Sequence, residues 1–182
     1  MKHTDMDIGF IVLCPNRDVR QIRNTVRSIQ HYTTREIICV VGGDTSPSEI
    51  KDLKPISENV YKGKDTITSL INTGMKRLKH KWGVFMFAGS ILKPMVEKRI
   101  CRFVESDKDI IFPVRDRKMG FVEGSTDCLM INKDTFDLVG ELPDVKIDKE
   151  DLNDFEVAKL MWCQQAFEKG CIFKGIVGIK IS

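Results

Sequence analysis

The chain has 182 residues, of which 42% are hydrophobic and 30% are charged, so it can bury one sizeable core. Its 29 basic and 26 acidic residues are mixed along the chain and leave a net charge of +3. No basic stripe typical of nucleic-acid-binding proteins stands out, so we do not expect the chain to bind nucleic acid. No apolar run approaches the roughly 20 residues of a membrane span, and no leader peptide is recognisable. We therefore expect a single soluble, cytoplasmic domain over residues 1–182.

The chain has six cysteines that lie singly, without a CxxC pair or a spacing suited to zinc. Most of them fall inside apolar stretches, where cysteine behaves as a small buried hydrophobe in a reducing compartment. His3, His31 and His80 lie in a terminal tail, at a predicted helix end and in a basic cluster. We therefore expect neither a metal cluster nor a histidine-based catalytic triad.

Apolar runs and helical periodicities alternate along the chain, and turn residues separate them. In the first half we expect, in chain order, a strand at 7–13, a helix at 19–31, a strand at 36–41, a short helix from 47 to 53, a strand at 59–61, a helix at 66–79 and a strand at 82–87. In the second half we expect a helix at 95–104, a strand at 109–114, a loop at 115–124, a strand at 128–131, a helix at 133–139, a charged loop at 144–149, a helix at 151–169 and strands at 171–173 and 176–181.

Capping residues mark several of these helix ends. Ser46, Pro47 and Glu49 form a capping box with proline at the first helical position, so two signals agree on that start. Asp65 can cap the next helix, and Gly170 is a typical stop for the last one.

Strands that alternate with helices through connections too long for hairpins indicate right-handed crossovers. The predicted fold class is α/β, a three-layer α/β/α sandwich with a mostly parallel central sheet. The apolar segments 8–13, 37–41 and 84–87 lack a polar face, which is typical of neighbouring buried strands in the centre of such a sheet.

The strand at 82–87 runs into the loop Ala88-Gly89-Ser90. Ligands of open α/β sheets bind at the carboxyl ends of the strands, and glycine permits a close backbone approach or a positive φ. This loop is therefore the first candidate for a binding site. The alternative is that Gly89 serves only a turn.

Five pieces of the chain follow one another in a fixed order. They are Val12-Leu13-Cys14-Pro15-Asn16-Arg17 at a strand end, Leu70-Ile71-Asn72-Thr73-Gly74 in a helix, the central strand with its trailing Leu92 and Pro94, Phe136-Asp137-Leu138-Val139-Gly140-Glu141-Leu142, and Asn153-Asp154-Phe155-Glu156-Val157. In this order they resemble the GT-A fold of family 2 glycosyltransferases, which are inverting enzymes that use nucleotide-sugar donors. The resemblance covers nearly the whole chain.

Two departures from the family concern the donor site. Where the family ends its second strand in two aspartates that hold the nucleotide base and ribose, this chain has Gly42 and Gly43, with Asp44 displaced. Where the family carries the Asp-x-Asp that binds Mg²⁺ or Mn²⁺, this chain has Phe87-Ala88-Gly89. Divalent ions need hard oxygen ligands, so we expect no divalent metal and no other cofactor.

The resemblance implies a set of site residues at the carboxyl ends of the parallel strands. The nucleotide-sugar-binding positions are Pro15, Arg17, Gly43, Asp44, Asn72, Gly89 and Ser90. Asp154 matches the carboxylate that takes the proton from the acceptor hydroxyl as general base. The alternative for Asp154 is structural, because an acidic residue in the first turn of a helix stabilises the helix dipole.

Two functions remain open. In the first, the chain is a small glycosyltransferase that binds a nucleotide-sugar donor and an unknown acceptor without metal. It would then hold the diphosphate with Arg17, Arg115 or Arg117 and with backbone amides. Alternatively, it is a catalytically inactive GT-A-fold module, kept for binding or for a protein partner within a larger assembly. Asp127 replaces a lost carboxylate only if the fold brings it to the loop.

Overall fold

A computed structural model describes residues 7–15, 18–92, 110–114, 128–146 and 153–177. Its helices are α1 (Val19–Tyr32), α2 (Pro47–Leu53), α3 (Ile67–Arg77), α5 (Lys133–Val139) and α6 (Asp154–Glu168). Its strands are β1 (Ile8–Cys14), β2 (Ile37–Val41), β3 (Asn59–Lys62), β4 (Trp82–Phe87), β5 (Ile110–Val114), β6 (Cys128–Asn132) and β7 (Phe173–Val177).

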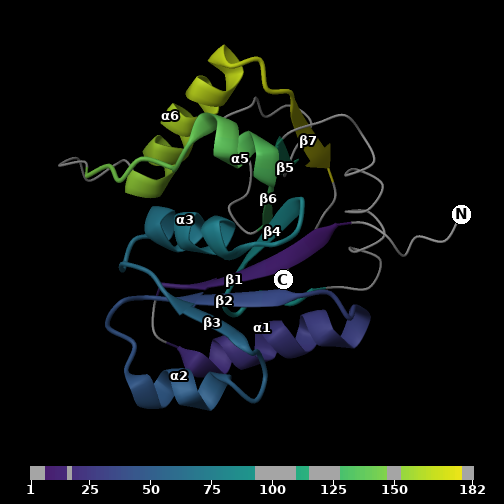
Figure 1. The fold of residues 1–182 in the computed structure, drawn as a ribbon, viewed down its shortest axis with the longest axis vertical. Helices are drawn as coiled ribbons and strands as arrows, with labels where there is room; N and C mark the ends of the chain where they lie inside the picture. The colour runs from purple at the N-terminus through teal and green to yellow at the C-terminus, as the bar shows by residue number, and fades with distance from the viewer. Residues whose placement is uncertain (1–6, 16–17, 93–109, 115–127, 147–152, 178–182) are drawn as a thin grey trace, which may run out of the picture.

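The seven strands form one sheet in the order β3-β2-β1-β4-β6-β5-β7 (Figure 1). All of them run in one direction except β6, which pairs antiparallel with both β4 and β5. In the centre of the sheet, Ile11 of β1 lies between Ile38 of β2 and Phe85 of β4. The prediction that these three buried strands are neighbours is confirmed, and so is the prediction of a mostly parallel sheet.

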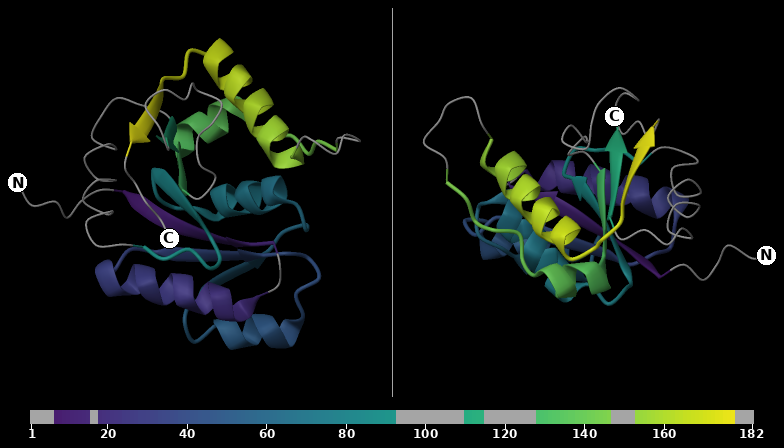
Figure 2. Two further views of the ribbon diagram at one scale, coloured as in Figure 1. Left: turned by 180° about the vertical axis from the view of Figure 1, so that it is seen from behind. Right: turned by 90° about the horizontal axis from the view of Figure 1, so that it is seen from above.

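Helices cover both faces of the sheet, which gives the predicted three layers (Figures 1 and 2). Because side chains alternate along a strand, Phe10 and Val12 of β1 pack with α1 on one face, whereas Ile11 and Leu13 pack with α3 and α6 on the other. The helix α1 contributes Val26 and its apolar neighbours to the first core. The sheet is thus buried on both sides, as its continuous apolar runs require.

Glycines let α3 approach the sheet closely. A Cβ built on Gly74 would lie 2.5 Å from Cγ2 of Ile11, and one built on Gly83 would lie 2.9 Å from Sδ of Met75. Larger residues at these positions would push the helix away from the strands. The close packing fixes the position of α3 and of the loop that precedes it.

The structure corrects some of the expected boundaries. Thr66, not Asp65, is the N-cap of α3, and its side chain accepts a hydrogen bond from the Ser69 amide. The capping box at Ser46 is confirmed. The antiparallel direction of β6 was not predicted, since an apolar run does not show which way a strand points. The helix expected at 95–104, the loop at 115–124, and most of the strand at 176–181 lie outside the described residues.

Two helices of the same layer begin at the carboxyl edge of the sheet, by which we mean the side where the carboxyl ends of the parallel strands lie. Both α3 and α6 lead into a strand of the common direction, β4 and β7 respectively, so each runs against the strands and starts at their carboxyl ends. The indole N–H of Trp162 donates to the Gly140 carbonyl at 2.7 Å and ties α6 to the end of α5. No helix in the described part of the chain is long and apolar enough to cross a membrane.

Candidate functional site

Loops that contain glycine follow three of the parallel strands at the carboxyl edge, and hydrogen bonds fix where these loops begin. The Gly42 amide donates to the Cys14 carbonyl at 3.1 Å, and the Ala88 amide donates to the Leu13 carbonyl at 2.8 Å. These bonds continue the ladders of the sheet by one residue beyond β2 and β4. These hydrogen bonds therefore attach the first residue of each loop to β1.

The loop after β4 is a tight turn held against α1. The Ser90 amide donates to the Phe87 carbonyl at 3.0 Å, and Gly89 has φ +98°, which is the region that glycine adopts at the third position of a type II turn. The Gly89 amide donates to the hydroxyl of Thr25 at 2.9 Å. Glycine is thus favoured by the turn itself, and the side chains of Phe87 and Ala88 contain no oxygen.

The loops after β2 and β3 lie side by side. A Cβ built on Gly43 would lie 3.2 Å from the Gly63 carbonyl oxygen and 3.9 Å from Cα of Lys64. The ammonium of Lys62 donates to the Gly43 carbonyl at 3.0 Å. Asp44, next in the chain, is exposed. Together the two loops present cationic and anionic side chains at one edge.

A pocket of about 220 Å³ separates the starts of α3 and α6. Asn153 is the N-cap of α6, with its side chain accepting a hydrogen bond from the Phe155 amide at 2.9 Å, and Asp154 is the first helical residue. The pocket is lined by Asp65, Thr66, Ile67, Thr68, Asp144, Val145, Lys146, Asn153, Asp154 and Phe155. Asp154 is exposed, so solvent and a ligand can reach its carboxylate.

The structure distributes the predicted site residues unevenly. Pro15, Gly43, Asp44, Gly89 and Ser90 follow strands β1, β2 and β4 at the carboxyl edge, and Asp154 lies at the start of α6 on the same edge. Arg17 lies outside the described residues, as do Arg115, Arg117 and Asp127.

Asn72 has a buried position within α3, and backbone groups occupy its side-chain amide. Its Nδ2 donates to the Leu142 carbonyl at 2.9 Å, and its Oδ1 accepts from the Leu142 amide at 2.9 Å. Asn72 is only 8% exposed. This pair of bonds gives Asn72 a structural role, the attachment of the segment between α5 and α6 to α3.

Sequence reasoning missed four charged residues of this edge. Lys62 is the last residue of β3, Lys64 and Asp65 lie in the loop after it, and Lys146 lines the pocket beside α6. All four are exposed. Charged residues directly after a predicted parallel strand were the signal that could have identified the first three.

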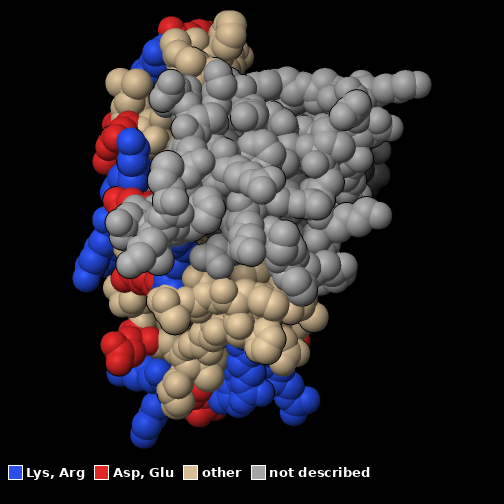
Figure 3. Space-filling view, turned by 90° about the vertical axis from the view of Figure 1, so that its right-hand side faces the viewer, with Lys and Arg blue, Asp and Glu red and all other residues tan. Residues whose placement is uncertain are grey.

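The electrostatic character of the edge is mixed. Its lysines and the N-terminal ends of α3 and α6 favour an anion, because the helix dipole is positive there. Within the described residues no group of three His, Cys, Asp or Glu side chains is arranged to hold a metal ion. On the face drawn in Figure 3, the described Lys and Arg side chains lie beside those of Asp and Glu along one side of the view.

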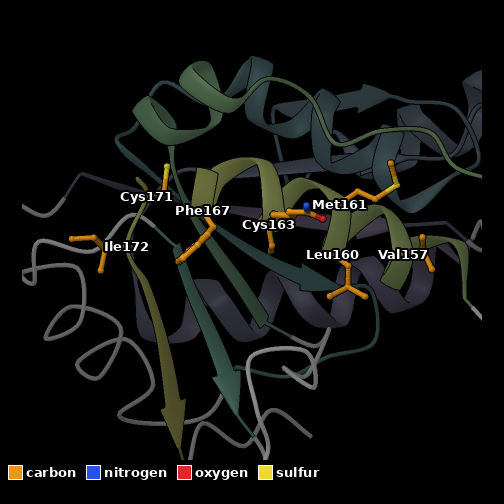
Figure 4. Close-up of a pocket in the computed structure, with 8 residues that line it drawn as sticks. Val157, Leu160, Met161, Cys163, Phe167, Cys171 and Ile172 are labelled. Atoms are coloured by element: carbon orange, nitrogen blue, oxygen red, sulfur yellow. The ribbon is translucent and has the colours of Figure 1, made fainter. Parts of the chain in front are cut away.

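A second pocket, of about 850 Å³, lies along α6 and the segment that follows it, and is chemically different (Figure 4). It is lined by Val157, Leu160, Met161, Cys163, Gln164, Phe167, Cys171 and Ile172. Burial raises the pKa of the Cys163 thiol to about 12, so this cysteine stays protonated and is a poor nucleophile. The pocket offers apolar surface rather than catalytic groups.

No protein-family model matches the chain, and no curated protein matches its sequence. Solved structures do match its fold. They include TarS 1–349 from S. aureus (12% identity, TM-score 0.64), the mannosyltransferase PcManGT from Pyrobaculum calidifontis in complex with GDP-Man and Mn²⁺ (11%, 0.67), and TarS 1–349 in complex with UDP (12%, 0.65).

These matches cover 97%, 98% and 95% of this chain, but the chain spans only 59%, 57% and 61% of the solved chains. At such low identity the likeness concerns the fold alone. The fold is the mixed α/β architecture of GT-A-type glycosyltransferases, which confirms the fold expected from the resemblance.

Proposed function

We propose that this chain is a nucleotide-sugar-binding domain of the glycosyltransferase type, and that it holds the donor at the carboxyl edge of its sheet without a divalent metal. Support comes from structural neighbours in complex with GDP-Man and with UDP. Further support comes from the glycine-containing loops and two helix N-terminal ends that meet at this edge.

One observation carries the metal-free part of the proposal. The turn formed by Phe87, Ala88 and Gly89 is anchored by backbone bonds and presents no carboxylate. In a metal-dependent enzyme the ion neutralises the charge on the leaving diphosphate. Here we assign that role to the exposed ammonium groups of Lys64 and Lys146 and to backbone amides, which bind phosphate oxygens by charge-assisted hydrogen bonds.

If the domain transfers a sugar, Asp154 is the proposed general base. Its carboxylate takes the proton of the acceptor hydroxyl, and the acceptor oxygen forms a bond to the anomeric carbon of the donor sugar. The bond from that carbon to the diphosphate breaks, and its electron pair leaves with the nucleoside diphosphate. Attack opposite the leaving group inverts the anomeric configuration.

A thermal-shift experiment tests donor binding. UDP, GDP, UDP-glucose and GDP-mannose are each added in EDTA, with adenosine as a control that lacks the diphosphate. A ligand that binds only the folded state adds about 2.7 kcal/mol of stability at a hundredfold excess over its Kd. We expect at least one nucleotide to raise the melting temperature in EDTA. No shift with any of them would contradict the proposal.

A second candidate function is that of an inactive GT-A-fold module with a protein partner. The apolar pocket on α6 favours it, because Phe167 is 71% exposed and Met161 43% exposed at its rim. The loss of acidic residues at Gly42 and Gly43 and at the turn after β4 also favours it. Absence of nucleotide binding in a folded protein would make this candidate the better account.

A further inference from the structure

The carboxylate of Asp65 lies over the end of a strand to which it does not belong. Asp65 is in the loop between β3 and α3, yet a Cβ built on Gly42, directly after β2, would lie only 2.3 Å from Oδ1 of Asp65. The same Cβ would lie 3.5 Å from the Pro15 carbonyl oxygen, at the end of β1. The carboxylate therefore occupies the space next to Gly42 that a side chain at that position would fill.

This carboxylate is also open toward a ligand. Asp65 is exposed and lines the 220 Å³ pocket that Asp154 shares. It makes no hydrogen bond or ion pair within the described part of the chain. Its loop, by contrast, is fixed, because the Gly63 amide donates to the Val41 carbonyl at 2.9 Å and the Lys64 amide donates to the Ser69 hydroxyl at 2.9 Å.

The chemistry of a carboxylate restricts what it can bind here. An ionised carboxylate only accepts hydrogen bonds, so its ligand must supply O–H or N–H groups. A diphosphate is excluded by like charge, whereas two adjacent hydroxyls of a sugar ring match its two oxygens. In dinucleotide-binding sheets an acidic side chain holds a ribose hydroxyl in this way.

We propose that Asp65 is a donor-binding residue of this site, and that it accepts hydrogen bonds from a vicinal pair of hydroxyls on the donor, those of the nucleoside ribose or those of the transferred sugar. The inference rests on the proposed function. Gly42 takes part by leaving room for the carboxylate, and the glycine after β2 is thereby explained as a requirement of the site.

Two substitutions test this assignment from different sides. Asp65→Asn keeps the shape and removes the charge. Gly42→Ala keeps Asp65 but forces its carboxylate away; the side chain can swing aside, because the contact is with its flexible end. Asp144→Asn is the matched control, since it removes the same charge from the same pocket. Calorimetry in EDTA on the full chain uses UDP, GDP, UDP-glucose, GDP-mannose and inorganic pyrophosphate as probes, and melting temperatures without ligand report the fold.

We expect Asp65→Asn and Gly42→Ala each to weaken nucleotide binding about tenfold, the loss expected for hydrogen bonds to a charged group. Pyrophosphate, which has no hydroxyl pair, should bind Asp65→Asn as well as or better than the wild type. Asp144→Asn should change affinities less than about twofold. A loss already present for UDP or GDP identifies the ribose, and a loss confined to the nucleotide-sugars identifies the transferred sugar.

Wild-type affinity of Asp65→Asn for every probe would overturn the assignment while leaving nucleotide binding intact. An equal loss in Asp144→Asn would overturn it too, because general charge would then explain both variants. If the wild-type protein binds none of the probes, the proposed function fails, and the role of Asp65 fails with it.

Discussion

The bonding of charged side chains differs between the amino edge of the central sheet, where the parallel strands begin, and the carboxyl edge, where they end. At the amino edge, the His80 ring lies between two carboxylates, with Nδ1 2.7 Å from Oδ1 of Asp7 and Nε2 3.2 Å from Oε2 of Glu36. The other oxygen of Glu36 accepts a hydrogen bond from the Asn59 amide at 3.0 Å. At the carboxyl edge, the Lys62 ammonium donates to the Gly43 carbonyl at 3.0 Å, but Lys64 and Asp65 make no side-chain bond within the described residues.

We interpret this difference as a separation of structural charges from charges that are available to a ligand. Paired side chains at the amino edge link the starts of β1 and β2 to the residues that follow α3. A charged side chain without a protein partner keeps its hydration and its conformational freedom until a ligand binds. Such side chains on well-placed loops are therefore suited to ligand binding. The comparison predicts that substitutions at one edge alter stability, and that substitutions at the other alter binding or turnover.

The largest expected effect at the carboxyl edge is that of Asp154→Asn. If the wild type transfers sugar, this change should lower the rate about 10²- to 10⁴-fold, because it removes a general base. Nucleotide affinity and melting temperature should stay nearly unchanged, since the base acts in the chemical step. Product formation from UDP-glucose and GDP-mannose with simple acceptors measures this rate. An active Asn variant would exclude Asp154 from the mechanism.

Asn72→Leu should affect stability instead. It leaves the buried amide and carbonyl of Leu142 without partners, so we expect the free energy of unfolding to fall by about 2–4 kcal/mol. Asn59→Leu, at the partly exposed amino edge, is the matched control and should cost less than about 1 kcal/mol. Urea titration measures both. Unchanged stability together with lost nucleotide affinity would instead place Asn72 in the donor site, as the sequence suggested.

The smallest effects are expected for one substitution at each edge, and this pair compares the two edges most directly. Lys64→Gln should weaken nucleotide binding about threefold to fivefold without changing stability, the range of one exposed charge pair. His80→Gln should lower the free energy of unfolding by about 1 kcal/mol and leave nucleotide affinity unchanged. Calorimetry and urea titration on both variants form one experiment. The reverse pattern, with His80 controlling affinity, would contradict the assignment of the two edges.

Much of the fold could be predicted from local patterns, because burial leaves a direct mark on the sequence. The apolar runs of β1, β2 and β4 predicted both the strands and their central place, and Ser46 marked the start of α2. The direction of β6 could not be predicted, since a short buried strand has the same composition in either direction.

The site was less predictable, because its key contacts join residues distant in sequence. The approach of Asp65 to Gly42 and the bonds of Asn72 to Leu142 depend on how loops and helices meet in space. In the sequence, Gly42 stood out only because it replaces an aspartate of the family's pattern. The folded chain gives a physical reason for the glycine, which is the approach of the Asp65 carboxylate. The role of Gly89 was within reach of sequence reasoning, since a turn after a buried strand favours glycine.

The most direct test of the central claim is calorimetric titration of UDP and GDP into the protein in EDTA and again in excess Mn²⁺. We expect stoichiometric binding of at least one nucleotide with the same affinity in both buffers, because in the proposed site lysines and backbone amides hold the diphosphate. Binding that appears only with Mn²⁺, or micromolar stoichiometric binding of Mn²⁺ alone, would contradict it.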